Sequence, residues 1–484
     1  MNKSFFTNSF SGVIQFIVSS VISFATISLF IHRLGLEKYG IFAILSLIGN
    51  LSIYVNLGLN LTIIKYLSEQ GKCVESDYDI LTSFLIILMV LIPMTLIGLF
   101  FRETILLNVL KIPLSYYQDV KVFYYFLLIS NVIVFLSQIG MAVIDSQQKI
   151  YLSNLGQIIY NLLYWGSIIF LIKTKFSFAL MGFCILIASI IWFLMVSIFA
   201  KSTWGWLKLK GYRSNFRRIV KKQLKYTSKI YLSNIIGFFY EPLTKVLISN
   251  FLGLNAVSYF DVALRIKSAV WSIFVKIYYP IFPLVSSLTD IKKVRGIIHK
   301  TEQYAAFYMT PLIMIFLFST RALISLWIGK DVNIIAFGVG AISISFIIGS
   351  VVLPNYQFLI SKNFAAKAIY LQSANVITNL IVFFITYKYL GYYSAVLSFS
   401  IAIFSSLFLS LYYQKKYLNS LIFDSINQIN KLLILFILCF MIGYTFNLFL
   451  KTDVMKIFIL PIPILLVSLI LLRKWGYLNL QFVS

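Results

Sequence analysis

Long apolar segments follow one another along almost the whole chain, separated by short polar breaks. Each segment has about 20 residues, the length of α-helix that crosses ~30 Å of bilayer hydrocarbon. The apolar runs are continuous and do not alternate with polar residues, which argues against the strands of a membrane barrel. The pattern therefore predicts an all-α protein that crosses a membrane many times.

Charged residues, Gly, Pro and Asn divide the chain into about fourteen predicted spans. We place them at residues 9–31, 41–64, 80–101, 121–144, 152–172, 178–200, 228–250, 258–284, 304–327, 333–360, 368–387, 393–413, 431–450 and 456–472. The expected organisation is two lobes of six helices followed by two C-terminal helices. The predicted parts are an N-terminal lobe at 1–200, a basic inter-lobe loop at 201–227, a C-terminal lobe at 228–413, and a loop with the last two spans at 414–484.

Composition agrees with the membrane reading and sets the expected orientation. Hydrophobic residues make up 60% of the chain and charged residues 12%, with a mean hydropathy of +0.91, whereas about a quarter of a soluble domain is charged. If the N-terminus is cytoplasmic, about 25 of the basic residues fall in inner segments and about 12 in outer ones, as the positive-inside rule requires. Both termini are therefore expected in the cytoplasm.

The net charge of +26 does not indicate nucleic-acid binding, because the basic residues are spread in small groups over many loops. The largest group lies at 201–226, where Lys and Arg alternate with Trp204, Trp206, Tyr212 and Phe216. This composition is typical of a helix lying on an anionic membrane surface. A docking site for an acidic partner or a lipid-linked phosphate is the alternative.

The eighth predicted span carries several charges, which are costly inside a bilayer and therefore mark candidate functional residues. At 100° per residue, Asp261, Arg265 and Lys276 fall within a sector of ~60°. Lys267 lies well off this face, near the outer end of the span, and we expect it to be paired or interfacial. Lys276 has no acid at helical spacing on its own span, which makes it the best candidate for an unpaired cation.

Two other spans have polar faces as well. On the seventh span, Glu241 and Lys245 share a face, and a polar stripe on the first span consists of Ser11, Gln15, Ser19, Thr26 and Arg33. Glu241–Lys245 and Asp261–Arg265 are each four residues apart, so these pairs could instead be internal salt bridges. Arg33 could equally extend its charge to the interface. We predict that substrate is bound by Arg265, Lys276, Lys245, Arg33 and Gln15, and that Glu241 and Asp261 are ion-coupling candidates.

Catalytic, metal and cofactor sites have little support. The chain has two histidines, and its three cysteines lack metal-ligand spacing. It also has no phosphate-binding glycine loop of the Walker type. We therefore expect no cofactor, no metal and no enzyme activity.

The two halves share a local pattern, Leu34-Gly35-Leu36 and Leu252-Gly253-Leu254, at the end of the first span of each. Such internal repeats are common in transporters. The chain resembles the Wzx-type polysaccharide flippases of the MOP exporter superfamily, which include O-antigen repeat-unit translocases. The residues that carry the resemblance are RLGLEKYGIFAI at 33–44, NLGLNLTIIKYLSE at 56–69, DSQQKIYLSNLGQ at 145–157, FLGLNAVSYFDVALRI at 251–266 and YPIFPLVSSLTD at 279–290.

The resemblance implies a two-lobed carrier with a cationic cavity in the bacterial cytoplasmic membrane. Its substrate would be an oligosaccharide linked to undecaprenyl diphosphate, and its partners membrane lipids, a polysaccharide polymerase and a chain-length regulator. It also implies proton or sodium coupling. Two alternatives remain: a multidrug-type proton or sodium antiporter, which would favour acidic residues, and a membrane-embedded polysaccharide polymerase, which would need a larger outer loop.

Overall fold

The structure is a computed structural model that describes residues 3–49, 59–208, 211–213, 215–224, 236, 239–278, 285, 290–329, 331–361, 364–419 and 426–477. These residues are almost all helical, and no strand occurs among them. Ten described helices are long and apolar enough to cross a membrane, or up to eleven if the bent pair Val332–Phe346 and Ile348–Ile360 is one span. The predicted fold class, an all-α polytopic membrane protein, is confirmed.

The exact number of spans remains a prediction. The predicted spans at 41–64, 228–250 and 258–284 each extend beyond the described ranges. The other predicted spans overlap the helices that pass the length and hydropathy criteria.

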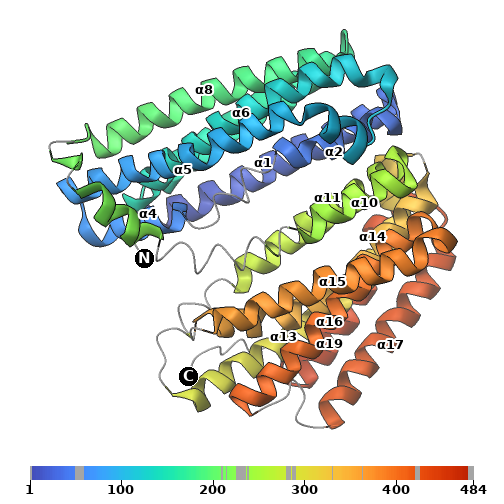
Figure 1. Cartoon of the computed structure of the whole chain (residues 1–484). Coiled ribbons are helices and arrows are strands. Elements are labelled where there is room, and N and C mark those ends of the chain that lie inside the picture. Colours follow the sequence, from blue (N-terminus) through green and yellow to red (C-terminus); the bar gives the residue numbers. More distant parts are fainter. Residues whose placement is uncertain are drawn as a thin grey trace. The chain divides into compact units, whose positions relative to one another are not determined.

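The described helices fall into two compact units. The first comprises Met1–Phe238 with Gly253–Asn255, and the second comprises Phe239–Leu252 with Ala256–Ser484. In unit 1, α6 packs against α8 and α5 (Figure 1). In the same unit, α1 packs against α7. The helices of unit 1 are α1 (Lys3–Leu34), α2 (Leu36–Gly49), α4 (Leu59–Gln70), α5 (Val74–Phe100), η1 (Thr104–Val109), α6 (Leu114–Ser146), α7 (Ile150–Lys173) and α8 (Phe178–Trp204).

The contact between α6 and α8 is fixed by a cap and a close approach. Asp119 of α6 accepts hydrogen bonds from the Ser177 hydroxyl at 2.7 Å and from the backbone N–H groups of Phe178 and Ala179 at 2.7 and 3.0 Å. These bonds satisfy donors that a helix N-terminus leaves free. Further along, a Cβ on Gly182 would lie 2.8 Å from the ring of Phe123 and 3.1 Å from its Cα, so the two backbones approach more closely than a larger residue allows.

The basic segment after α8 packs on the start of α5 within unit 1. The Trp204 indole N–H donates to Asp77 at 2.7 Å, and the Lys208 backbone N–H donates to the other oxygen of that carboxylate at 2.9 Å. Lys222 pairs with the buried Asp79 at 2.9 Å. Acidic residues of the protein thus compensate part of the positive charge of this segment, which the sequence analysis predicted to lie on the membrane surface.

Unit 2 is built around α13, which packs against α14, α17, α18 and α19. In the same unit, α16 packs against α14 and α15 (Figure 1). Phe307 and Met314 of α13 join Leu435, Cys439 and Ile464 in a core that attaches the last helices. The helices of unit 2 are α10 (Tyr240–Leu252), α11 (Leu254–Tyr278), α13 (Ile291–Trp327), α14 (Val332–Ser361), α15 (Ala365–Leu390), α16 (Tyr392–Leu418), α17 (Ile426–Phe449), α18 (Asp453–Phe458) and α19 (Pro461–Lys474).

Candidate functional site

A buried ion-pair network joins α10 and α11 in unit 2. Lys245 Nζ lies 2.7 Å from Asp261 Oδ1, and Arg265 Nε lies 2.7 Å from Asp261 Oδ2. Glu241 lies 3.6 Å from the same lysine. The Asp261 and Lys245 side chains are 3% and 5% exposed, whereas those of Arg265 and Glu241 are 23% and 30% exposed. Two acids therefore balance two bases, with Asp261 at the centre.

This network brings four of the predicted site residues together. Both pairs spaced four residues apart are salt bridges, as the structural alternative predicted. The sequence did not predict the bond between Lys245 and Asp261, because it depends on how α10 and α11 pack. Arg265 and Lys245 are therefore compensated cations, and their predicted roles in substrate binding remain predictions.

The other predicted residues lie elsewhere. Lys276 belongs to α11, but its side chain lies outside the described part of the structure. Arg33 is exposed in the last turn of α1 in unit 1. Gln15 of α1 is half-buried and donates to Ser19 at 3.2 Å.

Polar side chains connect α1 to α7, as the stripe on the first span indicated. Asn154 donates to Ser11 at 2.8 Å, and Asn161 donates to Ser19 at 2.6 Å. Gln15 extends this row through Ser19. Hydrogen bonds between helices satisfy polar groups that lipid could not, so this part of the stripe faces a neighbouring helix.

A cavity of about 280 Å³ lies in unit 2, and Lys267 is the charged residue among its described lining. Lys267 Nζ sits 4.7 Å from the centre of the Phe399 ring, and Tyr240 stacks on that ring at 4.2 Å. The cavity draws on α10, α11, α14, α15 and α16. Its other side chains with polar groups or aromatic rings are Trp271, Ser345, Phe346, Tyr356, Gln372, Asn375 and Ser406.

The chemistry of this cavity suits a polar ligand with an anionic group. A lysine ammonium attracts phosphate as a point charge. Asn375 has a buried carbonyl oxygen without a hydrogen-bond partner in the described part of the chain, and aromatic rings offer flat surfaces for sugar rings. Lys267 is the main residue that sequence reasoning missed. It lies off the face of α11 that carries Asp261, so helical spacing did not include it among the candidate residues.

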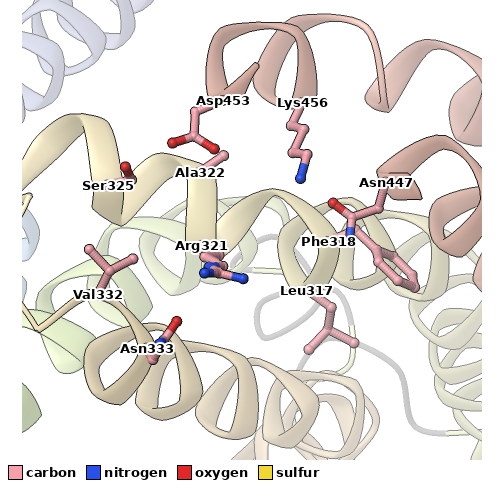
Figure 2. Close-up of a pocket in the computed structure, with 10 residues that line it drawn as sticks. All are labelled: Leu317, Phe318, Arg321, Ala322, Ser325, Val332, Asn333, Asn447, Asp453 and Lys456. Carbon is pink, nitrogen blue, oxygen red and sulfur yellow. The ribbon is translucent and has the colours of Figure 1, made fainter. Parts of the chain in front are cut away.

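A second cavity, of about 480 Å³, lies where α13 ends and α14 begins (Figure 2). Arg321 of α13, Lys456 of α18 and Asn447 of α17 extend toward it, with Asn333 and Asp453 also in its lining. Within the described ranges, neither Arg321 nor Lys456 has an acidic group within 4.0 Å. Two cations and two amides can accommodate an anionic group, with Asp453 limiting how much negative charge the cavity accepts.

The fold is that of a class of solved membrane transporters. The structure titled lipid II flippase MurJ in an inward closed conformation aligns with 96% of this chain and 99% of its own, with a TM-score of 0.71 and 16% identity. The structure of the MATE multidrug transporter DinF-BH aligns with 86% of this chain and 96% of its own (TM-score 0.64, 16% identity). The structure of the Vibrio cholerae MATE transporter VcmN aligns with 86% of this chain and 97% of its own, with a TM-score of 0.60 and 15% identity. At these identities the likeness shows the fold alone.

Sequence comparison then identifies the family. A family model described as polysaccharide biosynthesis protein matches residues 33–336, which is more than half of the chain. The chain therefore belongs to this polysaccharide biosynthesis family. It is also 21% identical over 346 residues to a Shigella flexneri protein provisionally named as an O-antigen transporter, covering 69% of this chain and 79% of that protein. The predicted resemblance to proteins of polysaccharide export is confirmed at the level of this family, and the solved transporters share its fold.

Proposed function

We propose that the protein carries undecaprenyl-diphosphate-linked oligosaccharide repeat units from the inner to the outer leaflet of the bacterial cytoplasmic membrane. The observation that carries this proposal is the cavity around Lys267, which combines one cation with amides and aromatic rings. The cation suits the diphosphate, and the amides and rings suit the glycan. Membership in a polysaccharide biosynthesis family supports a glycan as the cargo.

The physical task explains why such a cavity is needed. A diphosphate and a polar glycan lose their hydration when they enter hydrocarbon, which makes unaided crossing prohibitively slow. A polar cavity replaces part of that hydration with hydrogen bonds and a fixed positive charge. The apolar lipid tail can remain in the bilayer while the headgroup moves. Alternating access between the leaflets is the mechanism we propose, with both termini in the cytoplasm as the loop charges predict.

A multidrug-type antiporter is the second candidate, favoured by the fold likeness to MATE transporters. The charge of the cavity around Lys267 argues against it for cationic drugs, because a lysine repels them. A polymerase is the third candidate. The named relatives are transporters and flippases, so we propose that the protein has no catalytic role and delivers substrate to a separate polymerase and chain-length regulator.

The test is glycan display in a strain that lacks the gene, complemented with variants matched for membrane expression. Lys267→Gln removes the charge of the cavity, and Lys388→Gln removes an exposed lysine at the end of α15 as a control. A charged hydrogen bond contributes ~1.5–3 kcal/mol, so Lys267→Gln should reduce surface glycan roughly 10- to 100-fold. Full rescue by Lys267→Gln would refute the role of this cavity. Failure of the wild type to restore any glycan would refute the proposed cargo.

A further inference from the structure

One buried acid in unit 2 has no place in the network around Asp261. Glu302 lies in the N-terminal third of α13 and is 1% exposed. Its Oε2 accepts a hydrogen bond of 2.6 Å from Gln414 Nε2 of α16, which is also 1% exposed. Within the described ranges, no basic group lies within 4.0 Å of this carboxyl group.

The other oxygen atom of each side chain has no hydrogen-bond donor within the described ranges. Glu302 Oε1 and Gln414 Oε1 are both buried without a hydrogen bond in the described part of the chain. Both are acceptors when the carboxyl group is ionised, so neither can satisfy the other. A proton on Glu302 turns the carboxyl group into a donor, and Gln414 Oε1 is an acceptor that lacks one.

Within the described ranges, the other titratable groups near this end of α13 do not supply Glu302 with a hydrogen-bond donor or a compensating charge. His299, one turn earlier, contacts Gln303 at 2.7 Å, and Gln303 also donates to Gln428 of α17 at 2.9 Å. None of the neighbouring groups forms a hydrogen bond or ion pair with Glu302 within the described ranges. Within the described ranges, the titratable groups toward this end of α13 and on the elements that pack against it include Lys292, Lys293, Arg295, His299, Lys300, Tyr304, Tyr308, Tyr356, Tyr412, Tyr413, Lys415, Lys416, Tyr417, Lys431, Arg473 and Lys474.

We propose that Glu302 is a proton-binding site, protonated in this conformation and deprotonated when α13 and α16 separate enough to admit water. An isolated buried carboxylate is so unfavourable that the group neutralises instead, whereas a hydrated one ionises readily at neutral pH. The proton leaves as a hydrated ion, and the carboxylate remains on the protein. Opening and closing this contact therefore binds and releases one proton.

Glu302 thereby takes the place of Asp261 as the residue expected to couple ion movement to transport. Asp261 has a base at 2.7 Å from each of its oxygens, so two ion pairs stabilise its carboxylate in this conformation. Glu302 has one amide donor in the described part of the chain, so its protonation depends directly on hydration. The role in coupling rests on the proposed transport function, but the protonation state does not.

Infrared spectroscopy of the purified protein in lipid tests the protonation state directly. At neutral pH, the wild type should show the C=O absorption of a protonated carboxyl group, and Glu302→Gln should lose it. Glu241→Gln is the matched control, because Glu241 is ion-paired and partly exposed, and it should leave this band unchanged. If Glu302→Gln folds poorly, Gln414→Leu should shift the same band, since it removes the hydrogen-bond partner. An unchanged band in both variants would overturn the proposal.

Transport in proteoliposomes tests the coupling. An imposed pH gradient should accelerate headgroup translocation by the wild type several-fold and leave Glu302→Gln at the rate seen without a gradient. An equal gradient response in both proteins would overturn the coupling role and leave Glu302 a structural carboxylic acid. If the wild type moves no lipid-linked glycan, the proposed cargo fails, while the infrared result still decides whether Glu302 binds a proton.

Discussion

Asp261 is held between two cations, and its replacement by Asn should destabilise unit 2 strongly. The substitution keeps the side-chain size but removes the charge that compensates the buried Lys245. Breaking a buried ion pair in this way costs ~3–5 kcal/mol. Glu241 remains 3.6 Å from Lys245, and Arg265 is partly exposed to solvent. The loss should therefore be near the lower limit, at about 3 kcal/mol, or roughly a 100-fold change in the unfolding equilibrium.

A double-mutant cycle separates this effect from a general loss of packing. The free energy of unfolding of the purified protein would be measured by reversible titration with sodium dodecyl sulfate in mixed micelles. Lys245→Met alone should also destabilise, because it leaves Asp261 with fewer partners. The double variant Asp261→Asn, Lys245→Met should lose at least about 1 kcal/mol less than the sum of the two single variants. Additive losses, or a cost below about 1 kcal/mol for Asp261→Asn, would refute the account of this network.

Three further predictions concern other parts of the chain. Gly182→Ala should destabilise unit 1 by about 1–3 kcal/mol, because its Cβ would meet the backbone of Phe123. Gly166 has open space around it, so Gly166→Ala should change thermal stability little. Equal losses of stability in the two variants would contradict the packing argument. Asp79→Asn should accelerate tryptic cleavage within 215–224 several-fold, because it breaks the buried ion pair with Lys222. Glu75→Gln breaks an exposed ion pair and should have a small effect. Mass spectrometry compares the digests, and equal cleavage rates in the two variants would contradict this explanation. Phosphatidylglycerol should stabilise the double variant Arg321→Gln, Lys456→Gln against heat less than it stabilises the wild type. Lys451 is exposed, so Lys451→Gln should keep the full stabilisation by this lipid. Full stabilisation of the double variant would count against an anion site in this cavity.

The helices were largely predictable from sequence because membrane spans depend on local composition. Twenty apolar residues mark a span wherever they occur, and the spans from 80–101 to 178–200 correspond to α5, α6, α7 and α8. The salt bridges at i,i+4 were predictable for the same reason, since helix geometry alone brings those residues together. Both predictions depend on neighbours in sequence.

The missing parts of the site depend on contacts between helices. The Lys245–Asp261 bond joins two helices, and the Lys267 cavity requires five, so neither follows from the spacing within one span. Glu302 was overlooked because it lies just before the predicted span at 304–327, in a segment rich in basic residues. The structure continues that helix from Ile291 to Trp327 and buries Glu302 against Gln414. Burial, which sequence spacing does not report, distinguishes it from the exposed charges nearby.

Whether the protein moves lipid-linked repeat units across the membrane is decided by locating those units in a strain that lacks the gene. The lipid-linked fraction would be labelled with a membrane-impermeant reagent that reacts with the glycan, in intact spheroplasts and in inverted vesicles. If the protein is the flippase, single repeat units should accumulate and react in inverted vesicles but not in intact spheroplasts. Accumulation on the outer leaflet would indicate a polymerase, and no accumulation, with drug sensitivity instead, would indicate a multidrug antiporter.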